Sequence, residues 1–222
     1  MQIITTGDGS HTLFSGQFNE IYHSRHGAIQ ESRHVFIEAG LKPLLERNPD
    51  TIHIFETGFG TGLNAMLTML EGEKQHRSIN YTTIELYPVP IETIKELNYT
   101  SQLGYEFCYG PYHTLHLCRW EEEHQITPLF AFTKMQGSLV ERELPEHRFD
   151  LIYFDAFAPT HQPEMWTTEI FKKMHSALKP GGVLVTYCSK SVVQKAMKEA
   201  GFLIEKIPGP PGKREMLRAV AQ

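Results

Sequence analysis

Residues 51–64 read TIHIFETGFGTGLN. The first seven residues form a short apolar run of the kind found in a buried strand. Three glycines follow, and then residues typical of a helix start. Glycines at such a turn let the backbone bend tightly and approach a ligand closely. In open α/β sheets that ligand lies beyond the carboxyl ends of the strands. The stretch therefore predicts an α/β fold with a ligand site at Gly58, Gly60 and Gly62.

Strand-like and helix-like segments alternate along the rest of the chain, which predicts a parallel sheet covered on both faces. We expect strands at 51–57, 81–86, 130–133, 149–155, 183–188, 202–207 and 216–221, helices at 32–47, 61–70, 91–97, 166–178 and 191–200, and a turn at 179–182. Residues 101–128 show no clear pattern. We expect a single domain over 1–222, in which 1–30 are a turn-rich N-terminal extension and 31–222 are the core.

The composition is that of an ordinary globular protein, with 222 residues, 41% hydrophobic and 21% charged. No apolar run approaches the roughly 18 to 20 residues that a membrane span needs, and the first residues lack the plan of a signal peptide. The three cysteines are scattered and odd in number, which argues against a disulfide framework. We expect a cytoplasmic protein without a membrane partner.

Charge is distributed unevenly along the chain. The formal net charge is -5, yet residues 171–222 hold ten Lys or Arg against three acids, a local charge of +7. Two interpretations stay open: solvated helix faces, or a basic surface that holds phosphates, since phosphate attraction follows the local potential.

The glycine spacing and two acids indicate the ligand. The spacing G-x-G-x-G differs from the G-x-G-x-x-G of dinucleotide sites, which argues against a nicotinamide dehydrogenase. Glu56 at the head of the turn disfavours a pyrophosphate and suits a ligand with an amino group. Glu85, 29 residues later, ends the next strand, where a carboxylate can accept hydrogen bonds from ribose hydroxyls. These features point to S-adenosylmethionine; the alternative is a tight turn without a ligand.

A second acid-ended strand lies at 149–155, FDLIYFD. Asp155 follows the apolar run, and Pro159 and Pro163 stiffen the loop behind it. A carboxylate in this place can orient an amine and take its proton. The alternative is that Asp155 caps the following turn.

Three motifs together carry a resemblance to a known family: ETGFGTGLN at 56–64, DAFAP with PEMW at 155–166, and GKREM at 212–216. They resemble the tRNA 5-aminomethyl-2-thiouridine methyltransferases, which complete 5-methylaminomethyl-(2-thio)uridine. In some bacteria this enzyme is fused to an FAD-dependent oxidase, as MnmC, and in others it stands alone, as MnmD. The similarity runs from about Asp8 to Leu217. Because the chain has no room for the oxidase, the resemblance implies the stand-alone form.

The resemblance implies a class I S-adenosylmethionine-dependent methyltransferase fold, with a Rossmann-like sheet of seven strands, the last antiparallel. The implied reaction is methyl transfer from S-adenosylmethionine to the primary amine of 5-aminomethyluridine at the tRNA wobble position. Asp155 is implied as the essential acid. Cofactor contacts are implied for Tyr22, Glu31, Glu56, Gly58, Gly60, Gly62, Asn64 and Glu85. The family often has an acid after the glycine that follows the third strand. Here Gly137 is followed by Ser138, which implies an adenine contact through Ser138 or a backbone amide.

The tRNA substrate, bound through its anticodon region, suggests further contacts. Phe157 and Trp166 are candidates to stack on a flipped-out base, with core packing as the alternative for each. Lys213 and Arg214 are candidates to contact anticodon phosphates, with a solvated hairpin as the alternative.

Other patterns and functions remain to be weighed. We expect no metal, because the spacing of His113, His116, Cys118, Glu121 and His124 matches no zinc pattern. Three alternatives to the tRNA reaction stay open: a methyltransferase for a small-molecule amine, an aminopropyl transferase that uses decarboxylated S-adenosylmethionine, and a non-catalytic tRNA-binding protein. The sequence does not determine the oligomeric state.

Overall fold

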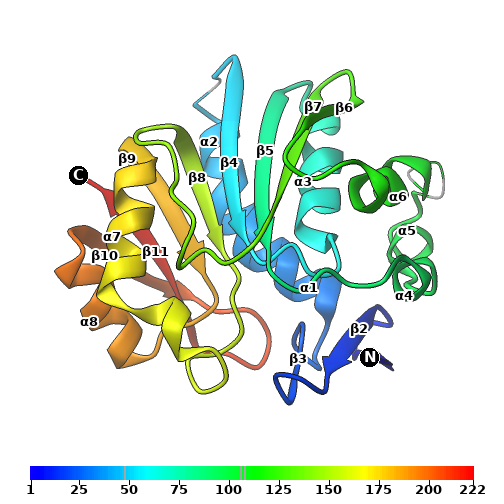
Figure 1. The fold of residues 1–222 in the computed structure, drawn as a ribbon, viewed down its shortest axis with the longest axis horizontal. Helices are drawn as coiled ribbons and strands as arrows, with labels where there is room; N and C mark the ends of the chain where they lie inside the picture. Colours follow the sequence, from blue (N-terminus) through cyan, green and yellow to red (C-terminus); the bar gives the residue numbers. More distant parts are fainter. Residues whose placement is uncertain (48, 106, 108) are drawn as a thin grey trace.

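Strand β4 (Thr51–Thr57), which leads into the glycine turn, lies inside an eight-stranded sheet in this computed structural model (Figure 1). The structure describes residues 1–47, 49–105, 107 and 109–222. The strand order is β10-β11-β9-β8-β4-β5-β7-β6. The remaining strands of this sheet are β5 (Ser78–Glu85), β6 (Glu123–Thr127), β7 (Phe130–Gln136), β8 (Phe149–Phe154), β9 (Leu178–Thr186), β10 (Phe202–Pro208) and β11 (Glu215–Ala221).

The strand directions bring five carboxyl ends to one edge of the sheet. β4 pairs in parallel with β5 and β8, β5 with β7, and β8 with β9. β11 is antiparallel to both β9 and β10, which confirms the expected antiparallel last strand. β6 is an additional edge strand, antiparallel to β7. The expectation of seven strands was therefore one short, because β6 lies in the region without a clear pattern.

Helices cover both faces of the sheet. They are α1 (Ala28–Ser32), the π-helix η1 (Arg33–Leu41), α2 (Lys42–Leu45), α3 (Leu63–Lys74), α4 (Ile91–Lys95), α5 (Tyr99–Gln102), α6 (Tyr109–Leu117), the 3-10 helix η3 (Pro163–Trp166), α7 (Thr168–Ala177) and α8 (Ser191–Glu199). Adjacent residues of β8 show the two layers. Tyr153 packs against Phe36 of η1 (ring centroids 5.0 Å apart), and Phe154 packs against Phe171 of α7 (5.1 Å). The alternation of side chains along a strand thus divides the core in two.

Short strands in the turn-rich N-terminal extension form a sheet of their own. β1 (Gln2–Thr5), β2 (His11–Ser15) and β3 (Glu20–Ile21) form a separate antiparallel sheet. Figure 1 places this sheet beside the carboxyl-end edge of the main sheet. The helix expected from residue 32 begins at Ala28 and contains the π-helix. Gly40 lies there because a Cβ at this position would be 3.0 Å from Val185 of the sheet. The expected helix stop at Asn48 lies outside the described residues, as does Cys108.

Two other boundaries differ from expectation. The turn at 179–182 is a bulge within β9, with Gly181 at φ +77 and a shift of register against β8. The helix expected at 166–178 is split, since η3 ends at Trp166 and the side chain of Thr167 caps α7 by accepting from the Ile170 N–H (3.3 Å). Within the described ranges, no helix is long and apolar enough to cross a membrane.

Candidate active site

A cavity of about 450 Å³ opens at the carboxyl ends of the parallel strands. Its wall includes the glycine turn after β4, the residues after β5, β7 and β8, and part of the N-terminal extension. The volume lies in the range of small-molecule sites. β4 lies between β5 and β8, so the strands that follow β4 in sequence lie first on one side of it and later on the other. Open α/β sheets bind ligands at such a point.

The glycine turn requires its glycines for two different reasons. Gly58 has φ +84, and a Cβ there would be 3.0 Å from the Asp155 carbonyl oxygen; Gly60 has φ +50, and a Cβ would be 3.0 Å from the Tyr22 ring. Both line the cavity. Gly62, at φ +73, faces away, where a Cβ would be 2.7 Å from Nε2 of His116. The first two glycines shape the cavity, and the third permits packing of α6.

Glu85 faces the cavity with both oxygens anchored. The Gly60 N–H donates to Oε2 (2.9 Å), and the Tyr87 N–H donates to Oε1 (2.7 Å). Burial raises the pKa of this carboxyl, while the backbone donors act in the opposite direction. Each oxygen keeps a second lone pair, so Glu85 can accept hydrogen bonds from ligand hydroxyls.

Asp155 lines the same cavity from the end of β8. Its N–H donates to Oγ1 of Thr57 (3.0 Å), and Nδ2 of Asn64 donates to its Oδ2 (2.9 Å). Burial raises its pKa to about 7, the hydrogen bond from Asn64 opposes that rise, and Glu31 adds to it. Asp155 is therefore positioned like a base that titrates near neutral pH.

Glu56 lies beneath the cavity and not in its wall. Its side chain is fully buried, and Oγ1 of Thr83 donates to Oε2 (2.8 Å). Oε1 of Glu56, Oδ1 of Asn64 and the Tyr81 hydroxyl have no hydrogen-bond partner among the described residues. Burial raises the pKa of Glu56 to about 8. Glu56 is thus absent from the residues that line the cavity, and its expected contact with a ligand amino group stays a prediction.

The raised pKa of Glu56 predicts a pH-dependent gain in stability from Glu56→Gln. Between about pH 4.5 and pH 8 the carboxyl is protonated when folded and ionised when unfolded, so the free energy of unfolding falls as pH rises. Gln cannot ionise and still accepts from Thr83. We expect the ligand-free variant to exceed the wild type by on the order of 2–4 kcal/mol at pH 8, and by little at pH 4.5. Urea unfolding at both pH values measures this difference. An equal difference at both would show that Glu56 does not titrate on unfolding.

Aromatic side chains of the extension form one wall. The Phe18 ring stacks on Phe157 (centroids 4.6 Å apart) and meets Tyr87 edge-on (5.7 Å), while Tyr22 meets Phe157 edge-on (5.0 Å). His161 Nδ1 lies 2.9 Å from the Phe18 carbonyl oxygen. Phe18 and Tyr87 were not among the expected site residues. No local pattern identifies them, because their importance comes from contacts between distant segments.

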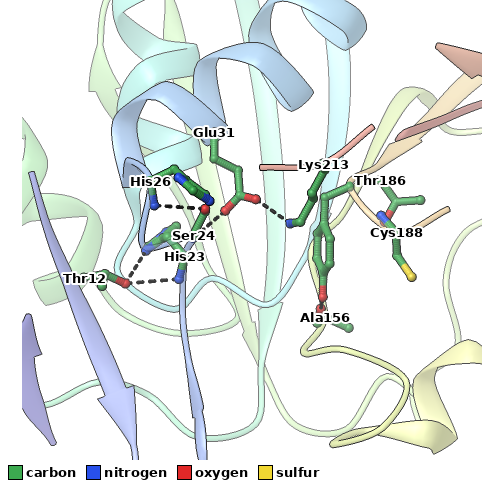
Figure 2. Close-up of polar contacts among 10 residues, drawn as sticks. Thr12, His23, Ser24, His26, Glu31, Ala156, Thr186, Cys188 and Lys213 are labelled. Carbon is green, nitrogen blue, oxygen red and sulfur yellow. Dashed lines mark hydrogen bonds and ion pairs between the residues drawn. The ribbon is translucent and has the colours of Figure 1, made fainter. Parts of the chain in front are cut away.

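An ion pair joins α1 to the C-terminal hairpin (Figure 2). Nζ of Lys213 lies 2.5 Å from Oε1 of Glu31 and 3.9 Å from the centre of the Tyr187 ring. Glu31 is further fixed by the Ser24 N–H, which donates to Oε2 (2.7 Å). Lys213, Glu31 and Tyr187 all line the cavity.

The other expected residues divide into two groups. Gly137 and Ser138 line the cavity, and the Gly137 N–H donates to the Glu85 carbonyl (3.0 Å). Trp166 is buried in the core and donates from Nε1 to the Phe157 carbonyl (2.8 Å), so it supports the loop. Arg214 lines a second hollow of about 280 Å³, which also includes Lys190.

His116, one of the residues in the histidine-rich stretch at 113–124, is half-buried and contacts the turn after β4. His116 Nε2 lies 3.1 Å from the Thr61 carbonyl oxygen, and burial lowers its pKa to about 3. Within the described part of the chain, no three His, Cys, Asp or Glu side chains gather as metal ligands would.

Comparison with known proteins finds relatives of this chain. A family model described as S-adenosyl-L-methionine-dependent methyltransferase matches residues 116–222. The tRNA 5-methylaminomethyl-2-thiouridine biosynthesis bifunctional protein MnmC of Nitrosospira multiformis is 34% identical over 219 residues, covering 93% of this chain and 35% of that protein. The protein of the same name from Burkholderia thailandensis is 30% identical over 222 residues, covering 93% and 33%. The chain thus spans about a third of the length of these relatives.

Solved structures support the same fold. The crystal structure of MNMC2 from Aquifex aeolicus has a TM-score of 0.81 at 23% identity, covering all of this chain and 70% of that one. Spermidine synthase from Thermotoga maritima has a TM-score of 0.52 at 14% identity, covering 96% and 68%. The class I methyltransferase fold is therefore confirmed, with a three-stranded N-terminal extension. The chain is homologous, over 93% of its length, to part of the MnmC proteins, and it has the fold of their methyltransferase domain.

Proposed function

We propose that this chain transfers a methyl group from S-adenosylmethionine to the primary amine of 5-aminomethyl-(2-thio)uridine at the wobble position of tRNA. The observation that carries the proposal is Asp155, a cavity-lining carboxylate at a strand end with a pKa raised to about 7. The names of the MnmC relatives supply the tRNA nucleoside.

The cavity fits S-adenosylmethionine in its chemistry. Gly58 and Gly60 let the backbone border the cavity where any Cβ would intrude. Glu85 offers lone pairs to ribose hydroxyls, and Gly137 and Ser138 follow the next strand, on the side proposed for adenine. Carboxylates of Asp155 and Glu31 are available to a cation. When bound, the cofactor supplies an activated methyl group on a cationic sulfur.

The residues of the chain prepare the amine for this transfer. The nitrogen must be neutral to present its lone pair, whereas an alkylammonium resembles lysine with a pKa near 10.4. Asp155 accepts a hydrogen bond from the amine and takes its proton, and Asn64 holds the carboxylate in place. The aromatic wall, which includes the half-buried Phe18, Tyr22 and Phe157, borders the cavity and aligns the reactants. Such alignment supplies much of the rate of an in-line displacement.

The tRNA is proposed to approach from the side of the extension and the β8 loop. Phe157 lines the cavity and is the candidate to stack on the uracil ring, a role that the core position of Trp166 does not suit. Arg214 and Lys190 border the neighbouring hollow, where neither has an ion-pair partner among the described residues, and are candidates for phosphate contacts.

The extension and core are proposed to act as one unit over 1–222, because both line the cavity. A tRNA substrate also implies a cytoplasmic location. The chief alternative is a methyltransferase for a small-molecule amine, and a non-catalytic tRNA-binding protein is a second; the raised pKa of Asp155 favours catalysis.

The decisive experiment supplies labelled S-adenosylmethionine and tRNA that lacks the final methyl group. Label in the wobble nucleoside supports the proposal. A folded protein that binds S-adenosylhomocysteine but labels only small amines would replace it with the first alternative.

The pKa of Asp155 predicts a titration near pH 7 in the ligand-free protein. Burial disfavours the carboxylate, so the group ionises about three pH units above its ordinary value of 3.8. Methyl transfer should consequently slow as pH falls below about 7. NMR titration of 13C-labelled aspartate carboxyl groups measures the pKa, and the signal missing from Asp155→Asn assigns it. An Asp155 signal that titrates near pH 4 would contradict the expectation.

A further inference from the structure

Lys213 points into the cavity although it belongs to a surface hairpin. It lies between β10 and β11, and its side chain is 33% exposed. Figure 2 shows the ammonium directed at Glu31, across the space between the C-terminal hairpin and α1. A contact with anticodon phosphates, which we expected for Lys213, would not explain why its ammonium is paired inside the cavity. A different role must explain a lysine held inside the cavity.

The hairpin loop is constructed to hold Lys213 in place. Gly212 has φ +86, a left-handed conformation that favours glycine, and a Cβ there would meet the ring of the exposed His26. Nε2 of His34 lies 2.8 Å from the Pro208 carbonyl oxygen at the start of the loop. The loop therefore contacts the extension at His26 and η1 at His34, on either side of the lysine.

The two partners of Lys213 are themselves fixed. The Ser24 N–H donates to Glu31 (2.7 Å), and the Tyr187 hydroxyl donates to the Ala156 carbonyl (2.9 Å), next to Asp155. Pre-positioned charges of this kind bind a ligand with little loss of side-chain freedom.

The charge of the cavity wall gives Lys213 particular weight. Among the residues that the structure describes, five carboxylates line the wall: Glu20, Glu31, Glu85, Asp155 and Glu164. Among the described lining residues, the Lys and Arg side chains are Lys213 and the exposed Arg25. An anionic group that enters this cavity needs a cation beside it. The methionyl end of S-adenosylmethionine is a zwitterion, with one ammonium and one carboxylate. Glu31 lines the wall beside Lys213, whereas Glu56 does not line it.

We propose that Lys213 binds the methionyl carboxylate of S-adenosylmethionine while Glu31 binds the methionyl ammonium, so that this pair selects S-adenosylmethionine over its decarboxylated form. The pair presents the opposite charges of an amino-acid end, already side by side. A ligand without the carboxylate gains no interaction with Lys213 when it binds. The inference rests on the cofactor part of the proposed function and not on its tRNA part. Selection against the decarboxylated compound also disfavours aminopropyl transfer, the alternative reaction that uses it.

Calorimetric binding of two ligands tests the proposal without tRNA. The ligands are S-adenosylhomocysteine and its decarboxylated analogue, which both carry the ammonium. We expect the wild type to prefer S-adenosylhomocysteine by about 10- to 100-fold, the value of a hydrogen bond between charged groups. Lys213→Met should lose most of that preference while its affinity for the analogue changes less than about threefold. Lys213→Arg should retain much of it.

The matched control is Lys206→Met on β10, which removes a lysine of the same hairpin that pairs with Glu215 (3.2 Å) away from the cavity. It should keep the wild-type preference. The ratio of two affinities within one protein sample remains valid if Lys213→Met is less stable. If Lys213→Met keeps the wild-type ratio of the two ligand affinities, the proposal is overturned, even if the variant binds tRNA more weakly. An equal loss of both ligands overturns it too, since Lys213 would then only hold the extension in place. If Lys213→Met loses the preference as expected but the wild type does not methylate tRNA, only the tRNA part of the proposed function is removed.

Discussion

Asp155→Asn is expected to lower kcat for methyl transfer to tRNA about 1,000-fold, the middle of the range for loss of a general base. Asn keeps the shape of the side chain and can still accept from Nδ2 of Asn64, which donates to Asp155 over 2.9 Å. It cannot take a proton. Because the pKa of Asp155 is raised to about 7, the substitution also removes an unfavourable buried charge, so the protein should fold normally. Transfer of labelled methyl groups to the wobble nucleoside measures the loss.

The control is Asp150→Asn on the same strand. The Asp150 carboxylate accepts from the His53 N–H (2.8 Å) and from Lys179 (2.7 Å), and it does not line the cavity. Asn can keep the first contact, so this variant should transfer methyl groups at the wild-type rate. If Asp155→Asn retained more than about a tenth of that rate, Asp155 would orient the amine and water would accept the proton.

The central sheet and the glycine turn were predictable because their signals are local. The apolar run before the glycines matches β4 (Thr51–Thr57) at both ends, and the acid expected at the end of the next strand is the last residue of β5. Positive φ angles at Gly58 and Gly60 were equally foreseeable, since a strand-to-helix turn at a ligand site favours them. Each of these features depends on fewer than ten consecutive residues.

The burial of Glu56 follows from its place in the strand. Side chains alternate along a strand, so Glu56 shares a face with Ile52 and Ile54, which are both buried in the core. That alternation points its carboxyl into the packed layer beneath the cavity. Its contact with a ligand amino group stays a prediction.

Other parts of the site had no local signal. The Glu31–Lys213 pair joins residues 182 positions apart. Phe18 is one aromatic residue in a turn-rich segment, and its contact with Phe157 arises only when the extension packs beside the β8 loop. The strand β6 was hidden for a related reason: its edge position leaves it partly exposed, so its sequence lacks the apolar run of a buried strand.

Gly58→Ala is expected to lower kcat/KM for methyl transfer about 100-fold, which is the effect of moving reactive groups by about 1 Å. At φ +84 the new Cβ is strained by its backbone conformation, and it also lies 3.0 Å from the carbonyl oxygen of Asp155. Relief of that contact must displace either the glycine turn or Asp155, which carries the proposed catalytic carboxylate. Both movements disturb the cavity, so the affinity for S-adenosylhomocysteine should fall as well.

Gly181→Ala separates the two causes. Gly181 has a similar φ of +77, but a Cβ there has no atom within 4 Å among the described residues, and the position is outside the cavity wall. This control should lose stability from backbone strain, about 1 kcal/mol or more, and keep the wild-type kcat/KM. Thermal unfolding and methyl transfer are measured on both variants. If the two lost stability equally and both retained activity, the contact between Gly58 and Asp155 would have no part in aligning the carboxylate. A selective loss of activity in Gly58→Ala would show that the glycine turn and Asp155 are positioned by one another, as the 3.0 Å approach requires.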